Sequence, residues 1–251
     1  MTTASRTMAC TMTAPTKAPQ LVVMPARRAL ERRETSDAPS DLLCRVEVHL
    51  ARLASLRQRA AGIAALSEDE RRLASGIASR ARRTLFIASR SFLRELVARR
   101  IGCLPAAVPI VRRADGKPRL GGGGMEFSLS HADGWIAVAL SAECAVGVDA
   151  EPVRPLAGMV EVVSEFFPPA ARAEFAATSP DKQSAVFFRW WTRIEAAVKA
   201  SGRGLDYARA CFDGVSWESC DIVPDLASAV AARTERPLHV DWHVAPADLG
   251  D

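Results

Sequence analysis

The sequence has no long apolar run and no closely spaced cysteine pair. None of its hydrophobic stretches approaches the roughly 20 residues that a transmembrane helix requires, which argues against a membrane protein. The six cysteines are scattered without any CxxC pair. This spacing argues against a zinc site or a disulfide framework and favours buried free thiols in a reducing cytoplasm. An apolar content of 49% and a charged content of 25% are typical of a soluble globular protein.

Lysine is also scarce, because only four of the 33 basic residues are lysine: Lys17, Lys117, Lys182 and Lys199. Arginine is concentrated between Glu68 and Arg100, where nine arginines face four acids. Such a segment is either a solvated helical face or a surface for phosphates or an acidic partner, and composition leaves both open.

The first 40 residues differ from the rest of the chain. They are rich in Thr, Ala and Pro, lack apolar periodicity and contain no acidic residue before Glu31. We therefore predict a disordered N-terminal extension over residues 1–40, or a true start further on, such as Met24. A transit peptide is a second interpretation, since basic, hydroxyl-rich and acid-poor segments are typical of those as well.

The N-terminal half, residues 41–154, alternates strand and helix signals. Order is expected to begin within 41–53, where alternating polar and apolar residues over 45–50 predict a half-buried strand. Two helices are expected between residues 66 and 102. Ser67 and Glu70 have the spacing of a capping box. Arg83, Arg90 and Arg94 lie largely outside the apolar stripe of the second helix. A loop over 112–124, a strand–turn–strand unit over 125–141 and a strand over 144–151 follow.

The C-terminal half, residues 155–251, begins after a linker marked by Pro152 and Pro155. Helices are predicted over 159–177 and from 182 to Gly202 or Gly204, with short strands over 210–212, 215–218 and 238–244. The element order predicts an α+β fold of two similar α/β halves in a pseudo-twofold arrangement. Each half would be a small antiparallel sheet packed with helices.

Three acids and a lysine suggest a polar site. Asp149 and Glu151 are two apart on a predicted strand and so point to the same face, while Glu195 and Lys199 share one face of a helix. Three carboxylates from a strand and a helix would form the oxygen-rich environment that Mg²⁺ prefers. Taken singly, each pair has a plainer interpretation, as solvent-facing strand residues or as a surface ion pair.

The order and spacing of four motifs resemble those of the 4'-phosphopantetheinyl transferases, in particular the pseudo-dimeric, surfactin-synthetase-type group. The motifs are "GKP" (116–118), "FSLSHADGW" (127–135), "VGVDAE" (146–151) and "WTRIEAAVKASGRGL" (191–205). The segment "RRTLFIASRSFLRELV" also resembles the arginine-bearing helix of that family. The similarity covers roughly residues 42–205 and is strongest from 116 to 151.

This resemblance implies a specific reaction and partner. Family members transfer the phosphopantetheine arm of coenzyme A to a serine of an acyl or peptidyl carrier protein, and release adenosine 3',5'-bisphosphate. The acidic carrier protein would suit the arginine-rich helix. The resemblance also implies a cytoplasmic, monomeric enzyme that uses neither a membrane nor a nucleic acid.

The same resemblance implies residue roles. Asp149, Glu151 and Glu195 would hold Mg²⁺. Glu195 or a metal-bound water would take the serine proton, and Lys199 would assist the transfer. The coenzyme A phosphates would contact a larger set, with Ser130 and His131 on the turn after "FSL": Arg83, Thr84, Lys117, Ser130, His131 and Lys199.

Two positions depart from the family pattern. Ile194 stands where the family has a lysine beside the metal-binding glutamate, so either the site lacks one cation or position 194 faces the core. The chain also lacks the apolar strand that usually follows the tail tryptophan, Trp242. A catalytically weakened relative that binds coenzyme A or a carrier protein is therefore the alternative function.

A basic nucleic-acid-binding protein is the least favoured alternative. The arginine helix offers no interleaved aromatic platform, because Phe86 and Phe92 belong to its apolar stripe.

Overall fold

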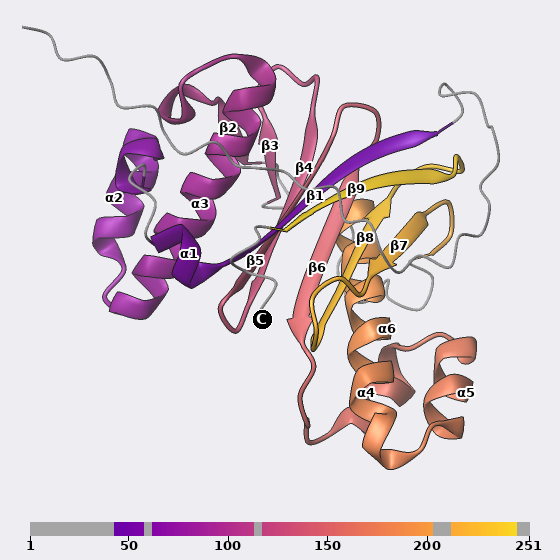
Figure 1. Ribbon diagram of the computed structural model, residues 1–251. Coiled ribbons are helices and arrows are strands. Elements are labelled where there is room, and N and C mark those ends of the chain that lie inside the picture. The colour runs from indigo at the N-terminus through magenta and orange to yellow at the C-terminus, as the bar shows by residue number, and fades with distance from the viewer. Residues whose placement is uncertain (1–42, 58–61, 113–116, 203–211, 245–251) are drawn as a thin grey trace, which may run out of the picture.

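The computed structural model describes residues 43–57, 62–112, 117–202 and 212–244. In Figure 1, helices α1 to α3 lie at one end of the molecule, the strands run through its middle, and α4 and α5 lie at the other end, from which α6 runs back beside the strands. The predicted extension over 1–40 and most of the predicted strand over 210–212 lie outside the described residues.

The larger sheet has the strand order β4-β5-β1-β9. Its strands are β1 (Cys44–Arg52), β4 (Glu126–Ala132), β5 (Trp135–Ser141) and β9 (Leu238–Val244). The β4, β5 and β1 strands pair antiparallel, whereas β9 runs parallel to β1, with His243 opposite His49. The alternating pattern that predicted β1 is confirmed, because Val46 and Val48 are buried while Arg45 is exposed.

The smaller sheet is antiparallel, with the order β6-β8-β7. It consists of β6 (Val146–Pro152), β8 (Leu226–Ala232) and β7 (Ser216–Cys220). The sequence did not predict β8, whose seven residues are all buried. Alanine is depleted in strands, so "LASAVAA" carries little intrinsic strand signal and owes its conformation to burial between β6 and β7.

The two sheets meet where β4 lies beside β6. Side chains of β4 bind β6 here, since the backbone N–H of Val148 donates to Oγ of Ser128 at 3.1 Å. The opposite edge of β6 pairs with β8. The seam between β4 and β6 therefore exposes polar side chains from both strands at one place, which is where the candidate site lies.

Helices α2 (Glu68–Gly76) and α3 (Arg80–Ile101) agree with the predicted helical segment. The capping box is confirmed, because Glu70 N–H donates to Oγ of Ser67 and the Ser67 N–H donates to the Glu70 carboxylate. The placement of Arg94 outside the apolar stripe was wrong. Its side chain is only 2% exposed, forms an ion pair with Glu70 and donates to the Val108 carbonyl at 3.0 Å. Buried charge of this kind needs both a counter-ion and hydrogen bonds.

Two short elements occupy segments without a strong sequence signal. The predicted loop over 112–124 contains part of a hairpin, β2 (Ile110–Arg112) and β3 (Pro118–Leu120). Helix α1 (Leu53–Arg57) directly follows β1, and one-turn 3₁₀ helices lie at Gly62–Ala65 and Pro105–Ala107.

Helices α4 (Met159–Phe166), α5 (Pro169–Ala177) and α6 (Pro180–Ser201) agree with the predicted helical segments, with Gly202 as the C-cap of α6. The segment 159–177 is, however, divided into two helices by a break at Phe167 and Pro168. Their apolar side chains pack with the alanines of β8 into one core. Helix α6 also lies against β6 at Gly147. A Cβ atom there would be 1.9 Å from the Ala196 carbonyl oxygen and 2.5 Å from the Ala200 nitrogen. Only glycine permits this approach, which sets the distance between the α6 and β6 side chains.

The mixed α+β class is confirmed, and the molecule has small sheets flanked by helices. The pseudo-twofold relation and the boundary at residues 154/155 stay predictions. Strand pairing crosses that boundary twice, because β6 belongs to the sheet of β7 and β8, and β9 belongs to the sheet of β1.

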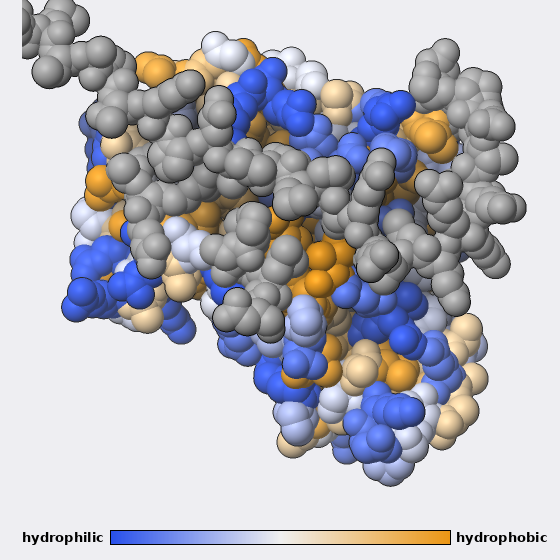
Figure 2. All heavy atoms as spheres, viewed as in Figure 1, coloured by the Kyte–Doolittle hydropathy of each residue, from blue (hydrophilic) through white to orange (hydrophobic). Residues whose placement is uncertain are grey.

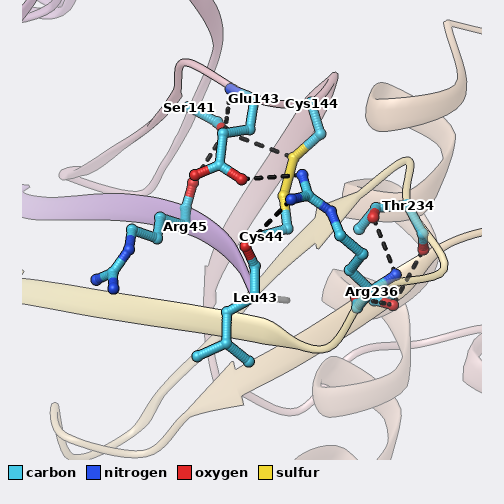
Figure 3. The surroundings of a disulfide bond; sticks show 9 residues. Leu43, Cys44, Arg45, Ser141, Glu143, Cys144, Thr234 and Arg236 are labelled. Atoms are coloured by element: carbon cyan, nitrogen blue, oxygen red, sulfur yellow. Dashed lines mark hydrogen bonds and ion pairs between the residues drawn. A yellow bond between two sulfur atoms is a disulfide. The ribbon is translucent and has the colours of Figure 1, made fainter. Parts of the chain in front are cut away.

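The expectation that all cysteines are free thiols was wrong for one pair. Cys44, at the start of β1, forms a disulfide with Cys144 in the loop before β6 (Figure 3). Arg236 lies beside it, donating to the Leu43 carbonyl at 3.3 Å and to Glu143 at 2.9 Å. The partners are 100 residues apart in sequence, which is why spacing did not predict them. Cys103 and Cys220 are free, and the other two cysteines lie outside the described ranges.

The described surface is mostly polar on the face drawn in Figure 2, with smaller hydrophobic areas between hydrophilic ones. Large apolar side chains that reach solvent include Leu104 and Val160, which are 76% and 65% exposed. None of the helices in the described ranges combines the length and apolar character required to span a bilayer.

Candidate active site

A pocket of about 820 Å³ opens at the seam between the sheets. Strands β4 and β6 and the C-terminal half of α6 supply most of its lining, which includes Lys117, Ser130, His131, Asp149, Glu151, Glu195 and Lys199. The structure therefore brings together seven of the nine residues predicted for the site. Trp191, one turn before Glu195, and Phe127 add apolar wall.

Asp149 lies at the centre of the polar lining. Its side chain is almost fully buried, and Oδ1 accepts hydrogen bonds from Ser130 Oγ at 2.6 Å and Lys199 Nζ at 2.8 Å. The other oxygen, Oδ2, is buried and has no hydrogen-bond partner among the described residues. A buried carboxylate oxygen without a donor is costly, and a cation is the ligand that would satisfy it best.

The two glutamates are half-buried beside Asp149. Burial raises the pKa of the Glu151 carboxyl, and the charge of Asp149 raises that pKa further, against the lowering effect of Arg154. Burial also raises the pKa of Glu195, while Lys199 lowers it and Asp149 raises it. Each carboxylate thus responds to the field of Asp149, which is the mutual repulsion that a bound cation relieves.

These residues fit a magnesium ion. Mg²⁺ takes oxygen ligands and is usually held by one or two protein carboxylates, with waters and substrate phosphates as the remaining ligands. In the part of the chain that the structure describes, the three carboxylates do not all place a ligand oxygen within 4.8 Å of one another. Such an open arrangement agrees better with an ion shared with substrate than with a closed protein cage.

The two lysines that line the pocket differ in their contacts. Lys199 Nζ donates to Ser130 Oγ, Asp149 Oδ1 and the Val148 carbonyl. Lys117 Nζ donates to the Val146 carbonyl at 2.9 Å and the Lys199 carbonyl at 2.7 Å. Lys117 therefore ties the segment before β3 to both β6 and the last turn of α6, in addition to lining the pocket.

Of the residues predicted to contact phosphates, two on strand β4 line the pocket and two on helix α3 do not. Ser130 and His131 line the pocket from strand β4, so their assignment to a turn was wrong, and Asp133 and Gly134 make the turn instead. Arg83 and Thr84, in the first turn of α3, are not among the described residues that line the pocket.

Arg90 was not predicted for the site, although it lines the pocket from α3. Burial lowers the pKa of its guanidinium. The sequence could have indicated Arg90, because it lies two helical turns beyond Arg83 and hence roughly on the same face of the helix.

Ile194 does not face the pocket. Its side chain is fully buried among the apolar residues of α4, α5, α6 and β8. Of the two hypotheses for this position, the structure supports the core-facing one. A side chain at position 194 packs in the core and does not line the pocket beside Glu195.

Comparisons with known proteins identify the family of the chain. A family model described as the 4'-phosphopantetheinyl transferase superfamily matches residues 145–250. The 4'-phosphopantetheinyl transferase HetI of Nostoc sp. is 33% identical over 178 residues, which are 66% of this chain and 73% of the relative.

Other similar proteins carry the same activity in their names. A 4'-phosphopantetheinyl transferase of Bacillus subtilis is 30% identical over 45% of this chain and 50% of its own length. The 4'-phosphopantetheinyl transferase AcpT of Salmonella typhimurium is 34% identical over 55% of this chain and 65% of its own length. The chain is thus an enzyme of the transferase class. It belongs to the 4'-phosphopantetheinyl transferase superfamily, as its motifs predicted.

Proposed function

We propose that this enzyme transfers the 4'-phosphopantetheine arm of coenzyme A to a serine of an acyl or peptidyl carrier protein, with Mg²⁺, in the manner of the surfactin-synthetase-type group. The observation that carries the proposal is the environment of the Asp149 carboxylate. One of its oxygens is held by Ser130 and Lys199, and the other is buried without a partner, in a pocket lined by two further carboxylates.

The reaction joins the serine oxygen to the phosphorus of the phosphopantetheine phosphate. The bond from that phosphorus to adenosine 3',5'-bisphosphate breaks, and the serine proton passes to a base. Mg²⁺ held by Asp149, Glu151 and Glu195 would supply charge neutralisation for the pyrophosphate and the departing bisphosphate.

The protein residues would provide position and charge. Glu195 or a metal-bound water would take the serine proton. Burial raises the pKa of the Glu195 carboxyl in the metal-free protein. Lys199 lies next to Asp149 and would meet phosphate oxygens once substrate enters. His131, Arg90 and Lys117 line the same pocket and add donors for the remaining phosphates.

The carrier protein would dock near the arginines of α2 and α3. Most of these side chains are exposed, including Arg71, Arg80 and Arg82, while Arg94 is not available because it is buried. Exposed positive charge increases the rate of encounter with an acidic partner and does so less at high salt.

Intact-mass analysis of an apo carrier protein, incubated with this enzyme, coenzyme A and Mg²⁺, tests the proposal. A mass gain of one phosphopantetheine arm is expected, and chelation of divalent ions should prevent it. Coenzyme A binding without any mass gain on fatty acid, polyketide or nonribosomal peptide carriers would favour the alternative of a weakened relative.

A further inference from the structure

A second polar cluster lies at the other edge of the larger sheet, on β1 and β9. Glu47, His49 and His243 each offer a potential ligand atom, and these atoms all lie within 4.8 Å of one another. The rings of His49 and His243, which are opposite each other in the parallel pair, stack with centroids 4.5 Å apart. Among the described residues, no other group of three or more histidine, cysteine or carboxylate side chains places its ligand atoms this close together.

Two buried imidazole nitrogens of the cluster, His49 Nε2 and His243 Nδ1, lack a hydrogen-bond partner among the described residues. Glu47 Oε2 forms an ion pair with Arg100. His49 is only 9% exposed, and its Nε2 lies 3.6 Å from Glu47 Oε2, beyond hydrogen-bond distance. Buried polar groups are almost always paired, so two unpartnered imidazole nitrogens beside a carboxylate indicate a missing ligand.

The placement of histidine supports this interpretation. The sequence has four histidines, and three of them, His49, His239 and His243, lie on this one pair of strands. Val46 and Val48 pack on the opposite face with Val240 and Trp242. The alternation of the strands therefore directs Glu47, His49 and His243 together to the α3 side of the sheet, where His49 makes an edge contact with Phe92.

We propose that Glu47, His49 and His243 form a binding site for one divalent transition-metal ion of the Zn²⁺ type. Two imidazoles and one carboxylate are a common donor set for Zn²⁺, with water as a fourth ligand. Ligand atoms about 2.1 Å from a tetrahedral ion are about 3.4 Å apart. The 3.6 Å between His49 and Glu47 is already close to that spacing.

Arg100 is the competing cation in the cluster. It forms an ion pair with Glu47 from the last turn of α3, and its side chain is 51% exposed. Because this side chain reaches solvent, it can turn away when an ion binds Glu47. Ion pairs that are partly open to solvent contribute little, so we expect Arg100 to weaken metal binding without preventing it.

A metal here would join the first and last strands that the structure describes. Its ligands come from β1 and β9, while the active-site pocket is lined by β4, at the opposite edge of the same sheet. Figure 1 shows β9 running alongside β1. The site is therefore distinct from the proposed magnesium site, and the ion would hold β9 on β1.

Calorimetric titration of tag-free, metal-stripped enzyme with Zn²⁺, in excess Mg²⁺, tests the site. One equivalent should bind. His243→Gln should weaken that binding by more than the roughly 10–100-fold that loss of an outer hydrogen-bond partner costs. His239→Ala is the matched control, because His239 lies on the same strand but is exposed and outside the cluster. The His239→Ala variant should bind Zn²⁺ with the affinity of the wild type.

Two further variants keep the test independent of folding defects and of the active site. Arg100→Gln removes the competing cation and should tighten Zn²⁺ binding several-fold. Asp149→Asn should leave Zn²⁺ binding unchanged. Co²⁺ substitution should give visible absorption bands that His243→Gln abolishes. Equal Zn²⁺ affinity in the wild type and His243→Gln, or loss of binding in Asp149→Asn, would overturn the proposal.

Discussion

Lys199 on α6 donates to one oxygen of Asp149 on β6 at 2.8 Å, while the other oxygen of Asp149 is buried without a partner. This pair joins a helix to a strand across the pocket, and the lysine side chain is 28% exposed. The lysine side chain is therefore open to the pocket, whereas the side chain of Asp149 is only 5% exposed.

Asp149→Asn should reduce kcat/KM for transfer by about 100-fold or more, the usual cost of removing one preorganised electrostatic contact. The amide has nearly the same shape but neither charge nor a second acceptor for a cation. Mass-based assays with coenzyme A and an apo carrier protein measure the loss, and a thermal melt checks the fold. Asp221→Asn, at an exposed position, is the control. Wild-type turnover in Asp149→Asn would show that the metal assignment is wrong.

Ile194→Lys should destabilise the protein by about 3–5 kcal/mol, the cost of an uncompensated buried charge, without any gain in turnover. The reason is that Ile194 is fully buried in the apolar core between α6 and β8. Denaturant unfolding and steady-state kinetics of the same variant measure both quantities. Ile194→Val, which removes one methyl group, should cost only about 0.5–1.5 kcal/mol. A stable lysine variant with improved kcat/KM would mean that this position faces the phosphates.

Gly147→Ala should cost about 3 kcal/mol or more and also impair transfer, because the added methyl group would clash with the backbone of α6. Displacement of α6 would move Glu195 and Lys199 away from Asp149 together. Denaturant unfolding midpoints measure the loss of stability, and kcat measures the loss of transfer. Gly76→Ala is the matched control, since a Cβ there meets nothing within 4 Å. If Gly147→Ala behaved like Gly76→Ala, the tight approach of α6 to β6 would be contradicted.

Glu218 links pH to stability in the smaller sheet. Burial raises the pKa of its carboxyl, against the hydrogen bond from Trp242 Nε1 to Oε1 at 2.8 Å. The folded state therefore holds this proton more tightly than the unfolded state, and the stability from that proton is lost as pH rises through the folded pKa. Glu218→Gln keeps an acceptor for Trp242 but has no charge to bury.

Glu218→Gln should accordingly be more stable than the wild type near pH 8 and equally stable below pH about 4, under the unfolded pKa. Thermal melts across that range measure the difference. Glu235→Gln, at an exposed position, should follow the wild type throughout. A difference between Glu218→Gln and the wild type that did not change with pH would rule out the carboxyl as its cause.

Local patterns predicted most helices and most of the polar residues that line the pocket. The Ser67–Glu70 capping box and the stripe of α3 are encoded by neighbouring residues, and so is the shared face of Asp149 and Glu151. What the sequence could not predict depends on contacts between distant segments. Strand β8 is an alanine-rich strand stabilised by burial, and the Arg94–Glu70 pair requires the packing of α2 on α3.

The parallel pairing of β1 with β9 also sets an order on folding during synthesis. Chains grow from the N-terminus at about 5–20 residues per second, and contacts between distant segments are slow to form. Strand β1 is made early, but the strand that covers its free edge is the last one described. Until β9 leaves the ribosome, the nascent protein has an open sheet edge at Cys44–Leu50, where chaperones or wrong partners would bind.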